Sequence, residues 1–162
     1  MNYEDLLVEA SSLGAIVKEK PLKATDGLIY GNRIAIRNGI RTERQKACVL
    51  AEEIGHYKTT SGNILNQGDT GNRKQELRAR EDAYDAMIGL DGIIECYRYG
   101  CRSLYDMAQH LEVTDSFLIN ALKRYSEKYG ISVEHKGYVI SFAPHLSVLY
   151  MGDKGDGDKK GV

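Results

Sequence analysis

One stretch, residues 42–60 (TERQKACVLAEEIGHYKTT), constrains the fold of this 162-residue chain more than any other. Thr42 followed three residues later by Gln45 forms a capping box, which predicts that a helix begins here. Apolar residues then recur at steps of three and four, so the helix should bury one face. These residues are Ala47, Leu50, Ala51 and Ile54. The stretch therefore predicts an amphipathic helix that packs against a core.

The polar face of this helix carries residues with a spacing that metal chemistry can use. Glu52 and His56 are four residues apart, about one turn from each other on nearly the same face, and Glu53 lies beside them. Zinc peptidases carry H-E-x-x-H on such a helix, where two imidazoles bind the metal and the glutamate takes a proton from the bound water. Here the pattern is E-E-x-x-H, because Glu52 replaces the first imidazole.

A second long helix is predicted over residues 72–88, after a loop over residues 61–71 that is rich in Gly, Asn, Ser and Asp. Glu76 stands at the head of its apolar stripe, where a lone carboxylate must be solvated, paired or bound. If the two helices cross, Glu76 can complete a three-ligand metal site with Glu52 and His56. The alternative is a surface ion pair with Arg73 or Arg80. The spacing leaves both open.

The residues before the first long helix predict a short helix over 3–13 and then a small antiparallel sheet. The sheet is indicated by GLIY and RIAI on either side of Gly31 and Asn32, a two-residue turn typical of hairpins. An edge strand beside the long helix could pair with an extended peptide substrate. The sheet could equally serve only to cover the helix.

Residues 103–129 predict two helices joined by a short turn, which is the pattern of a helix-turn-helix. Glu112 occupies the turn position that usually carries glycine, and the second helix mixes acidic and basic residues. A helix that reads DNA should be more clearly basic, so we favour a packed hairpin or a protein-docking surface over DNA binding. A β-hairpin over 131–142, an apolar segment over 146–151 and a disordered tail over 152–162 should follow.

The composition indicates a soluble protein with no bias toward nucleic acid or membrane. Its 22 basic and 23 acidic residues nearly cancel. No apolar run reaches the roughly 20 residues that cross a bilayer, and the first ten residues are acidic rather than those of a secretion signal. Three cysteines, Cys48, Cys96 and Cys101, cannot all pair, which agrees with a reducing compartment. We expect a cytoplasmic protein.

Two segments together resemble a known family. KACVLAEEIGHYKTTSGNI (residues 46–64) and NRKQELRAREDAYDAMIGL (residues 72–90), with the helix-turn-helix-like stretch behind them, resemble the ImmA/IrrE family of metallo-endopeptidases. The likeness is to the short form found in prophages and mobile elements of Gram-positive bacteria, and it covers roughly residues 1–150. It implies a zinc-dependent peptidase that cleaves or antagonises a helix-turn-helix repressor of the same element.

The resemblance also assigns roles to individual residues. His56 matches the second metal histidine, Glu53 the catalytic carboxylate and Glu76 the third metal ligand. Glu52 stands where the family has its first histidine, and Asp82 stands where it has a bulky aromatic residue. The implied fold is α+β: a metallopeptidase-like core over 1–90, with the sheet against two long helices, and a helix-turn-helix-like and β-hairpin portion over 91–151.

The substitution at position 52 bears on the chemistry of the implied site. Two carboxylates and one imidazole cancel the charge of a divalent ion, whereas two imidazoles and one carboxylate leave it positive. The bound metal should therefore be a poorer Lewis acid, and its water should have a higher pKa. We expect such a site to be slow, to prefer a divalent ion other than zinc, or to be empty. The competing hypothesis is a regulator without catalysis that binds the repressor or DNA.

Overall fold

The first part of the chain folds as a short helix, a three-stranded sheet and a long helix. The computed structural model describes residues 1–60 and 69–152. Helix α1 (Tyr3–Ser12) is followed by strands β1 (Ile16–Lys20), β2 (Gly27–Tyr30) and β3 (Arg33–Arg37) and by helix α2 (Glu43–Thr60). Asn2 and Asp5 form a capping box at the start of α1. The Thr42 hydroxyl accepts the backbone N–H of Gln45 at 3.1 Å, so α2 begins where the sequence predicted.

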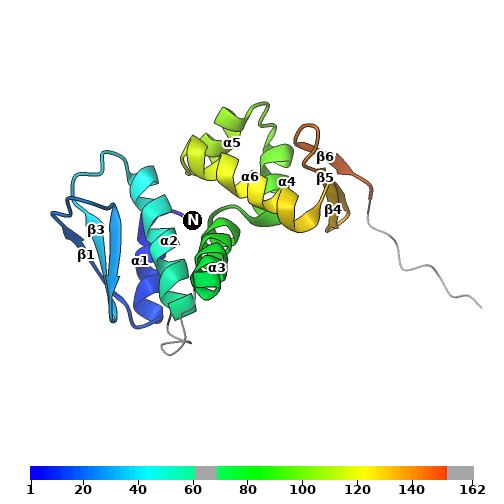
Figure 1. Cartoon of the computed structure of the whole chain (residues 1–162). Helices are drawn as coiled ribbons and strands as arrows, with labels where there is room; N and C mark the ends of the chain where they lie inside the picture. Colours follow the sequence, from blue (N-terminus) through cyan, green and yellow to red (C-terminus); the bar gives the residue numbers. More distant parts are fainter. Residues whose placement is uncertain (61–68, 153–162) are drawn as a thin grey trace, which may run out of the picture.

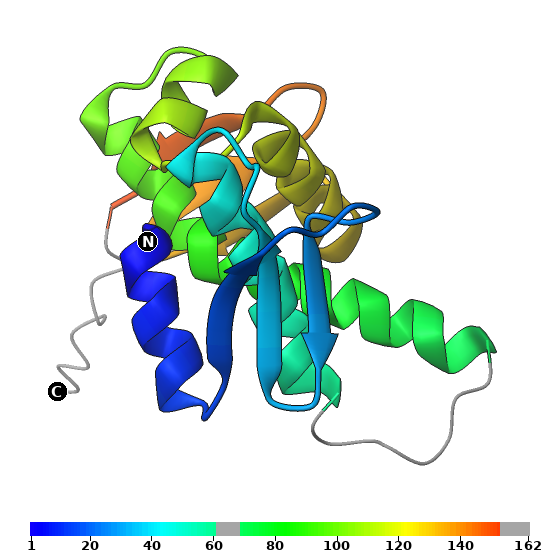
Figure 2. The same ribbon diagram turned by 90° about the vertical axis from the view of Figure 1, so that its left-hand side faces the viewer.

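The first sheet is mixed, which corrects the prediction of an antiparallel sheet. The hairpin at Gly31 and Asn32 is present, and β2 runs antiparallel to β3. Strand β1, however, runs parallel to β3, and the strand order is β1-β3-β2. Strands β1 and β2 form the two edges of the sheet, and β3, which follows them in the chain, fills the central position between them. Turn residues identify a hairpin but do not say which strand becomes central. Strand β2 is consequently an open edge, seen in Figure 2 on the side toward which α3 extends.

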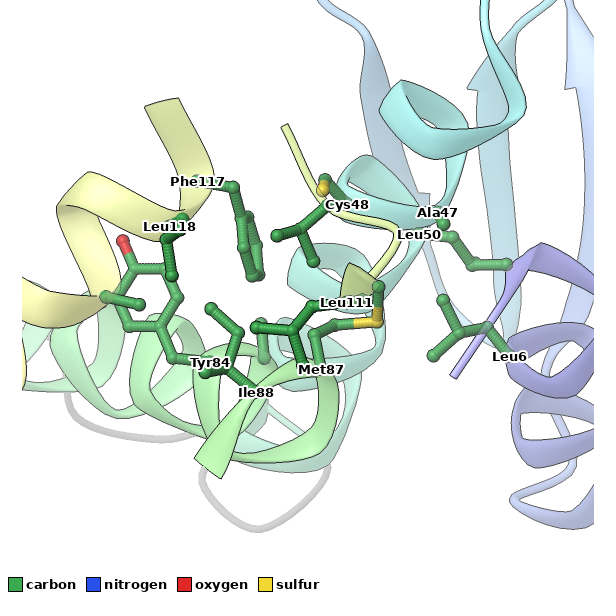
Figure 3. Packing of buried hydrophobic residues seen from close by; sticks show 14 of the residues in the cluster. Leu6, Ala47, Cys48, Leu50, Tyr84, Met87, Ile88, Leu111, Phe117 and Leu118 are labelled. Atoms are coloured by element: carbon green, nitrogen blue, oxygen red, sulfur yellow. The ribbon is translucent and has the colours of Figure 1, made fainter. Parts of the chain in front are cut away.

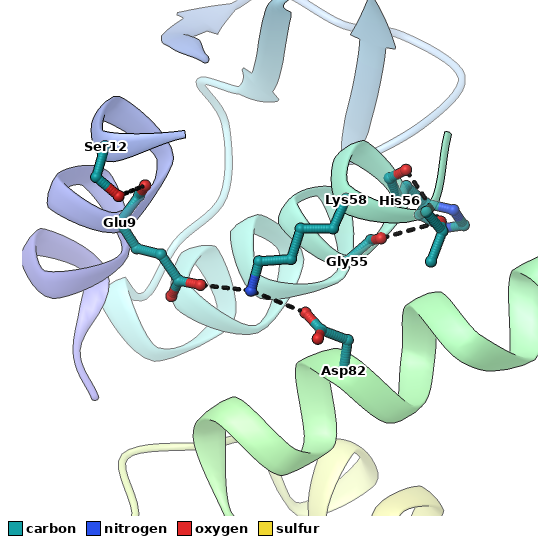
Figure 4. Close-up of polar contacts among 7 residues, drawn as sticks. Glu9, Ser12, Gly55, His56, Lys58 and Asp82 are labelled. Atoms are coloured by element: carbon teal, nitrogen blue, oxygen red, sulfur yellow. Dashed lines mark hydrogen bonds and ion pairs between the residues drawn. The ribbon is translucent and has the colours of Figure 1, made fainter. Parts of the chain in front are cut away.

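Helices α2 and α3 (Asp69–Met87) form the centre of the molecule. Their closest approach is at Gly55, where an added Cβ would lie 2.9 Å from the carbonyl carbon of Ala79. Beside this crossing, the Lys58 ammonium lies 2.6 Å from the Glu9 carboxylate of α1 and 3.1 Å from the Asp82 carboxylate of α3 (Figure 4). Of the loop predicted over 61–71, residues 61–68 lie outside the described residues, and residues 69–71 are helical instead.

The second part contains three helices and a second sheet: α4 (Gly89–Tyr99), α5 (Leu104–His110) and α6 (Asp115–Tyr129), then β4 (Ser132–His135), β5 (Tyr138–Ser141) and β6 (Ser147–Tyr150). Helix α4 is longer than the short turn of helix expected from residue 93 to residue 99. The predicted hairpin is extended by β6 into an antiparallel sheet of order β4-β5-β6. The predicted tail over 152–162 lies outside the described residues from 153 onward.

The connection between α5 and α6 turns as predicted, although glutamate rather than glycine occupies the turn position. Glu112 adopts a left-handed φ of 56°, which is the conformation that glycine usually supplies at this position. The Thr114 side chain then accepts the backbone N–H of Phe117 at 3.2 Å and caps α6. The chain therefore makes the predicted turn at the energetic cost of a non-glycine residue at positive φ.

A continuous cluster of buried apolar side chains joins the two parts. Figure 1 shows the succession of the first sheet, α1 and α2, then α3, then α4 to α6 with the second sheet. Figure 3 shows part of this cluster, with Leu6 and Leu50 on one side and Tyr84, Phe117 and Leu118 on the other. The Tyr84 and Phe117 rings meet edge to face at 5.1 Å, which fixes α6 on α3. The α+β class is confirmed, and no helix among the described residues is long and apolar enough to cross a membrane.

Candidate functional site

Helix α2 presents Glu52, Glu53 and His56 on the face opposite its buried stripe. All three side chains are half-buried, whereas Leu50, Ala51 and Ile54 between and before them are buried. This division follows from the helical period, because residues four apart share a face and the apolar stripe fixes the orientation of the helix. The sequence pattern was therefore sufficient to place these three side chains together at the edge of the core.

Glu53 lies against strand β2, at a contact that the sequence did not reveal. A Cβ added at Gly27 would lie 2.7 Å from the carboxyl carbon of Glu53, so a larger residue there would displace the Glu53 side chain from this position. Burial, together with the charges of Glu52 and Glu76, raises the pKa of Glu53 to about 7. Among the described residues Glu53 makes no hydrogen bond or ion pair. It is a carboxyl group held close to the open edge of the sheet.

Glu76 reaches the α2 face, where it is shared between two partners. Its Oε2 lies 3.4 Å from Nε2 of His56, and its Oε1 lies 2.9 Å from Nε of Arg80. The contact with His56 agrees with the predicted convergence of α3 on α2. The contact with Arg80 is the surface ion pair that the sequence left as the alternative. Both interactions are present at once because the two oxygens of the carboxylate point in different directions.

Glu52 does not join this contact. Its side chain lines a hollow of about 350 Å³ between α2 and the start of α6, together with Cys48 and Phe117. The pKa of Glu52 is raised, chiefly by burial. The charge of Arg80 lowers this pKa, and the charge of Glu76 raises it. Burial and the charge of Glu52 also raise the pKa of the Tyr84 phenol. The Glu52 carboxylate is thus near enough for the Arg80 charge to lower its pKa, but it makes no ion pair within the described part of the chain.

As arranged, these residues do not fit a metal ion. Across residues 1–60 and 69–152 no group of three His, Cys, Asp or Glu side chains is placed to hold one. Only His56 and Glu76 of the three predicted ligands come together, and a guanidinium already neutralises Glu76. The cation of this site is Arg80. Sequence analysis named Arg80 only as a partner for Glu76, since nothing in the spacing placed it beside Glu52 as well.

The fold agrees with a comparison to known families. The profile of the IrrE N-terminal-like domain, Peptidase_M78, matches residues 8–123. The chain belongs to this family. The match to the IrrE N-terminal-like domain runs from α1 into α6, so it includes Glu52, Glu53, His56 and Glu76 and ends before the second sheet. No curated protein matches the chain.

Membership in the IrrE-like family confirms the resemblance to the ImmA/IrrE proteins and makes this a metallopeptidase-like protein. The family suggests a peptidase, and the described side chains differ from the predicted metal site in two respects. Glu52 does not join the contact between His56 and Glu76, and Arg80 pairs with Glu76, the third predicted ligand. The structure also adds Gly27 to the site. A glycine at the start of a predicted strand was the one sequence signal for a close approach at that position.

Proposed function

We propose that this IrrE-like chain is a regulator that grips an extended segment of a protein partner, a helix-turn-helix repressor of the same genetic element, without metal-dependent cleavage. The observation that carries the proposal is the position of Arg80, whose guanidinium pairs with Glu76 at 2.9 Å on the face where a divalent ion would need that carboxylate. A carboxylate that already pairs with a guanidinium gains less from binding a second cation.

The open edge of β2 is the surface that receives the partner. Leu28 and Tyr30 are 51% and 84% exposed, so two large apolar side chains stand in solvent on a strand with an unpaired edge. An extended segment added there would make main-chain hydrogen bonds, and these side chains would supply apolar contact. The segment would run past Gly27 and therefore past the Glu53 carboxyl group.

A protein partner is favoured over DNA by the charges of α6. Arg124 lies 2.7 Å from Glu81 and 3.1 Å from Glu127, and Lys128 lies 3.9 Å from Asp85. Two of the three cations of α6 are thus occupied by carboxylates, and only Lys123 is left to bind phosphates. At the start of α6 the exposed residues are Asp115, Ser116, Ile119 and Asn120, which carry no positive charge.

The second candidate is a zinc-dependent endopeptidase that cleaves the repressor, and the state of Glu53 favours it. A carboxyl group with a pKa of about 7 is suited to accept a proton at neutral pH. In this candidate Glu53 would be the proton acceptor. Glu52, His56 and Glu76 would hold zinc or another divalent ion after Arg80 had moved away. The two candidates differ in metal content and in the fate of the partner.

The test combines metal analysis with a binding assay. The full chain is incubated with Zn²⁺ or Mn²⁺, desalted and analysed for bound metal, then mixed with the purified repressor. We expect no stoichiometric ion, an intact repressor after incubation, and a complex that Leu28→Glu with Tyr30→Glu weakens at least about tenfold. Tyr105→Glu, at an exposed aromatic residue on α5, is the matched control and should bind normally.

Two variants separate the candidates. Glu52→His combined with Arg80→Gln adds an imidazole beside His56 and removes the competing cation. This double variant should gain one divalent ion per chain. If the unmodified chain already holds one ion, Glu76→Ala removes it, and the repressor is cut in a manner that Glu53→Gln abolishes, the protein is the endopeptidase. A repressor that neither binds nor is cut would exclude both.

A further inference from the structure

A second cavity lies in the part of the molecule that the peptidase-like site does not use. It has a volume of about 880 Å³ and lies between α4, α5, α6 and the connection from β5 to β6. None of its lining residues belongs to α1, α2, α3 or the first sheet. Its apolar wall is formed by Ile93, Met107, Leu122, Phe142, Leu146 and Val148. The volume falls within the roughly 300–1,000 Å³ of small-molecule sites.

The rim of this cavity exposes more apolar surface than the fold requires. Tyr97 and Leu104 line it and are 46% and 43% exposed. Contiguous apolar surface around a hollow is unusual on a protein that has no partner there, because each exposed carbon is less favourable in water. The cavity therefore presents an apolar interior that a ligand could cover.

Two cations at the rim make no side-chain ion pair with a carboxylate within the described residues. The Asp106 carboxylate accepts the backbone N–H of Arg102 at 3.0 Å, and the charge of Arg102 helps to lower the pKa of Asp106. Arg102 and Lys123 both line the cavity, and within the described residues neither side chain makes an ion pair. Lys123 contrasts with its neighbour Arg124, which pairs with Glu81 and Glu127. Glu127 also lines the cavity, but its Oε2 is bound by Arg124 at 3.1 Å, so its charge is already balanced. The exposed His145 and the hydroxyls of Ser103, Ser126 and Ser147 also belong to the lining.

We infer that this cavity binds a small amphiphile with an apolar body and one anionic head group, such as an alkyl carboxylate. The apolar wall takes the body, and Arg102 and Lys123 hold the head by charge complementarity. The head lies at the rim, where its charge stays partly solvated, and the chain needs no rearrangement of its core. The inference is independent of the function proposed for the Glu53 face.

Fluorescence of anilinonaphthalene sulfonate, an apolar molecule with one anionic group, tests the inference on the full chain, which contains no tryptophan. We expect a single saturable site from which dodecanoate displaces the dye and dodecanol displaces it at least about tenfold less effectively. Arg102→Gln with Lys123→Gln should weaken dodecanoate about tenfold and leave dodecanol unchanged. Lys18→Gln with Arg33→Gln, which removes two cations from the first sheet, is the charge-matched control.

Cys101 gives a second measurement that needs no dye. It is half-buried and lines the cavity, while Cys48 and Cys96 are buried, so a thiol reagent should label Cys101 first. Dodecanoate should slow this labelling several-fold, and Cys101→Ser should abolish the protected signal. Equal affinity for dodecanol, an unchanged affinity in the double variant, or no saturable binding would overturn the inference. Dye binding that disappears as the chain dimerises would also overturn the inference, because a second copy of the chain would then cover the cavity.

Discussion

Two charged clusters lie on the same pair of helices and are built differently. The Lys58 cluster contains Glu9, Lys58 and Asp82, and its one cation bridges two carboxylates from α1 and α3. The Glu53 cluster contains Glu52, Glu53, His56, Glu76 and Arg80, and its one guanidinium pairs with only one of three carboxylates. The first cluster is closed and holds helices together. The second leaves half-buried carboxyl groups that have no partner in the described part of the chain, a cost that is typical of a functional rather than a structural site.

The largest effect should come from the crossing on which both clusters depend. Gly55→Ala would place a methyl group within 2.9 Å of the Ala79 carbonyl carbon, and backbone cannot move aside as a flexible side chain can. We expect the free energy of unfolding to fall by at least about 2 kcal/mol, measured by urea denaturation. Gly39→Ala is the matched control, because a Cβ there meets nothing within 4 Å. Equal stability of the two variants would show that the helices are not in close contact.

Removing the cation from each cluster compares how much each contributes to the free energy of unfolding. Lys58→Met leaves the Glu9 and Asp82 carboxylates facing each other across a partly buried contact, so we expect a loss of about 1–2 kcal/mol in the free energy of unfolding. Arg80→Met breaks an exposed pair between residues four apart on one helix and should cost less than about 0.5 kcal/mol. Equal losses, compared at the same ionic strength, would remove the distinction between a closed and an open cluster.

The smallest effect is a dependence on pH that belongs to Glu53. Its pKa rises from an ordinary 4.5 to about 7 on folding, so the folded state binds a proton more tightly than the unfolded chain. The stability contributed by this group is therefore lost as the pH rises from about 4.5 to about 7, and it stays lost above that. Glu53→Gln should gain stability relative to the unmodified chain over this interval. A difference in melting temperature that does not change between pH 5 and pH 8 would contradict this.

The sequence by itself determined the elements whose cause is local. The capping residue Thr42 and the three- and four-residue apolar steps fixed the start and orientation of α2, and with them the common face of Glu52, Glu53 and His56. Position 112 was identified as the turn of the helical hairpin although its residue is glutamate. The segments over 46–64 and 72–90, with the helix-turn-helix-like stretch behind them, were enough to indicate the family that the profile then confirmed.

Only the tertiary structure decided how these elements meet. Strand order in the first sheet, the contact of Gly27 with Glu53, and the sharing of Glu76 between His56 and Arg80 all join residues that are distant along the chain or depend on how a side chain turns. Helical spacing fixes which face a carboxylate lies on, but the neighbouring helix determines which cation it meets. In this protein that difference separates a predicted metal site from a face on which Arg80 pairs with Glu76.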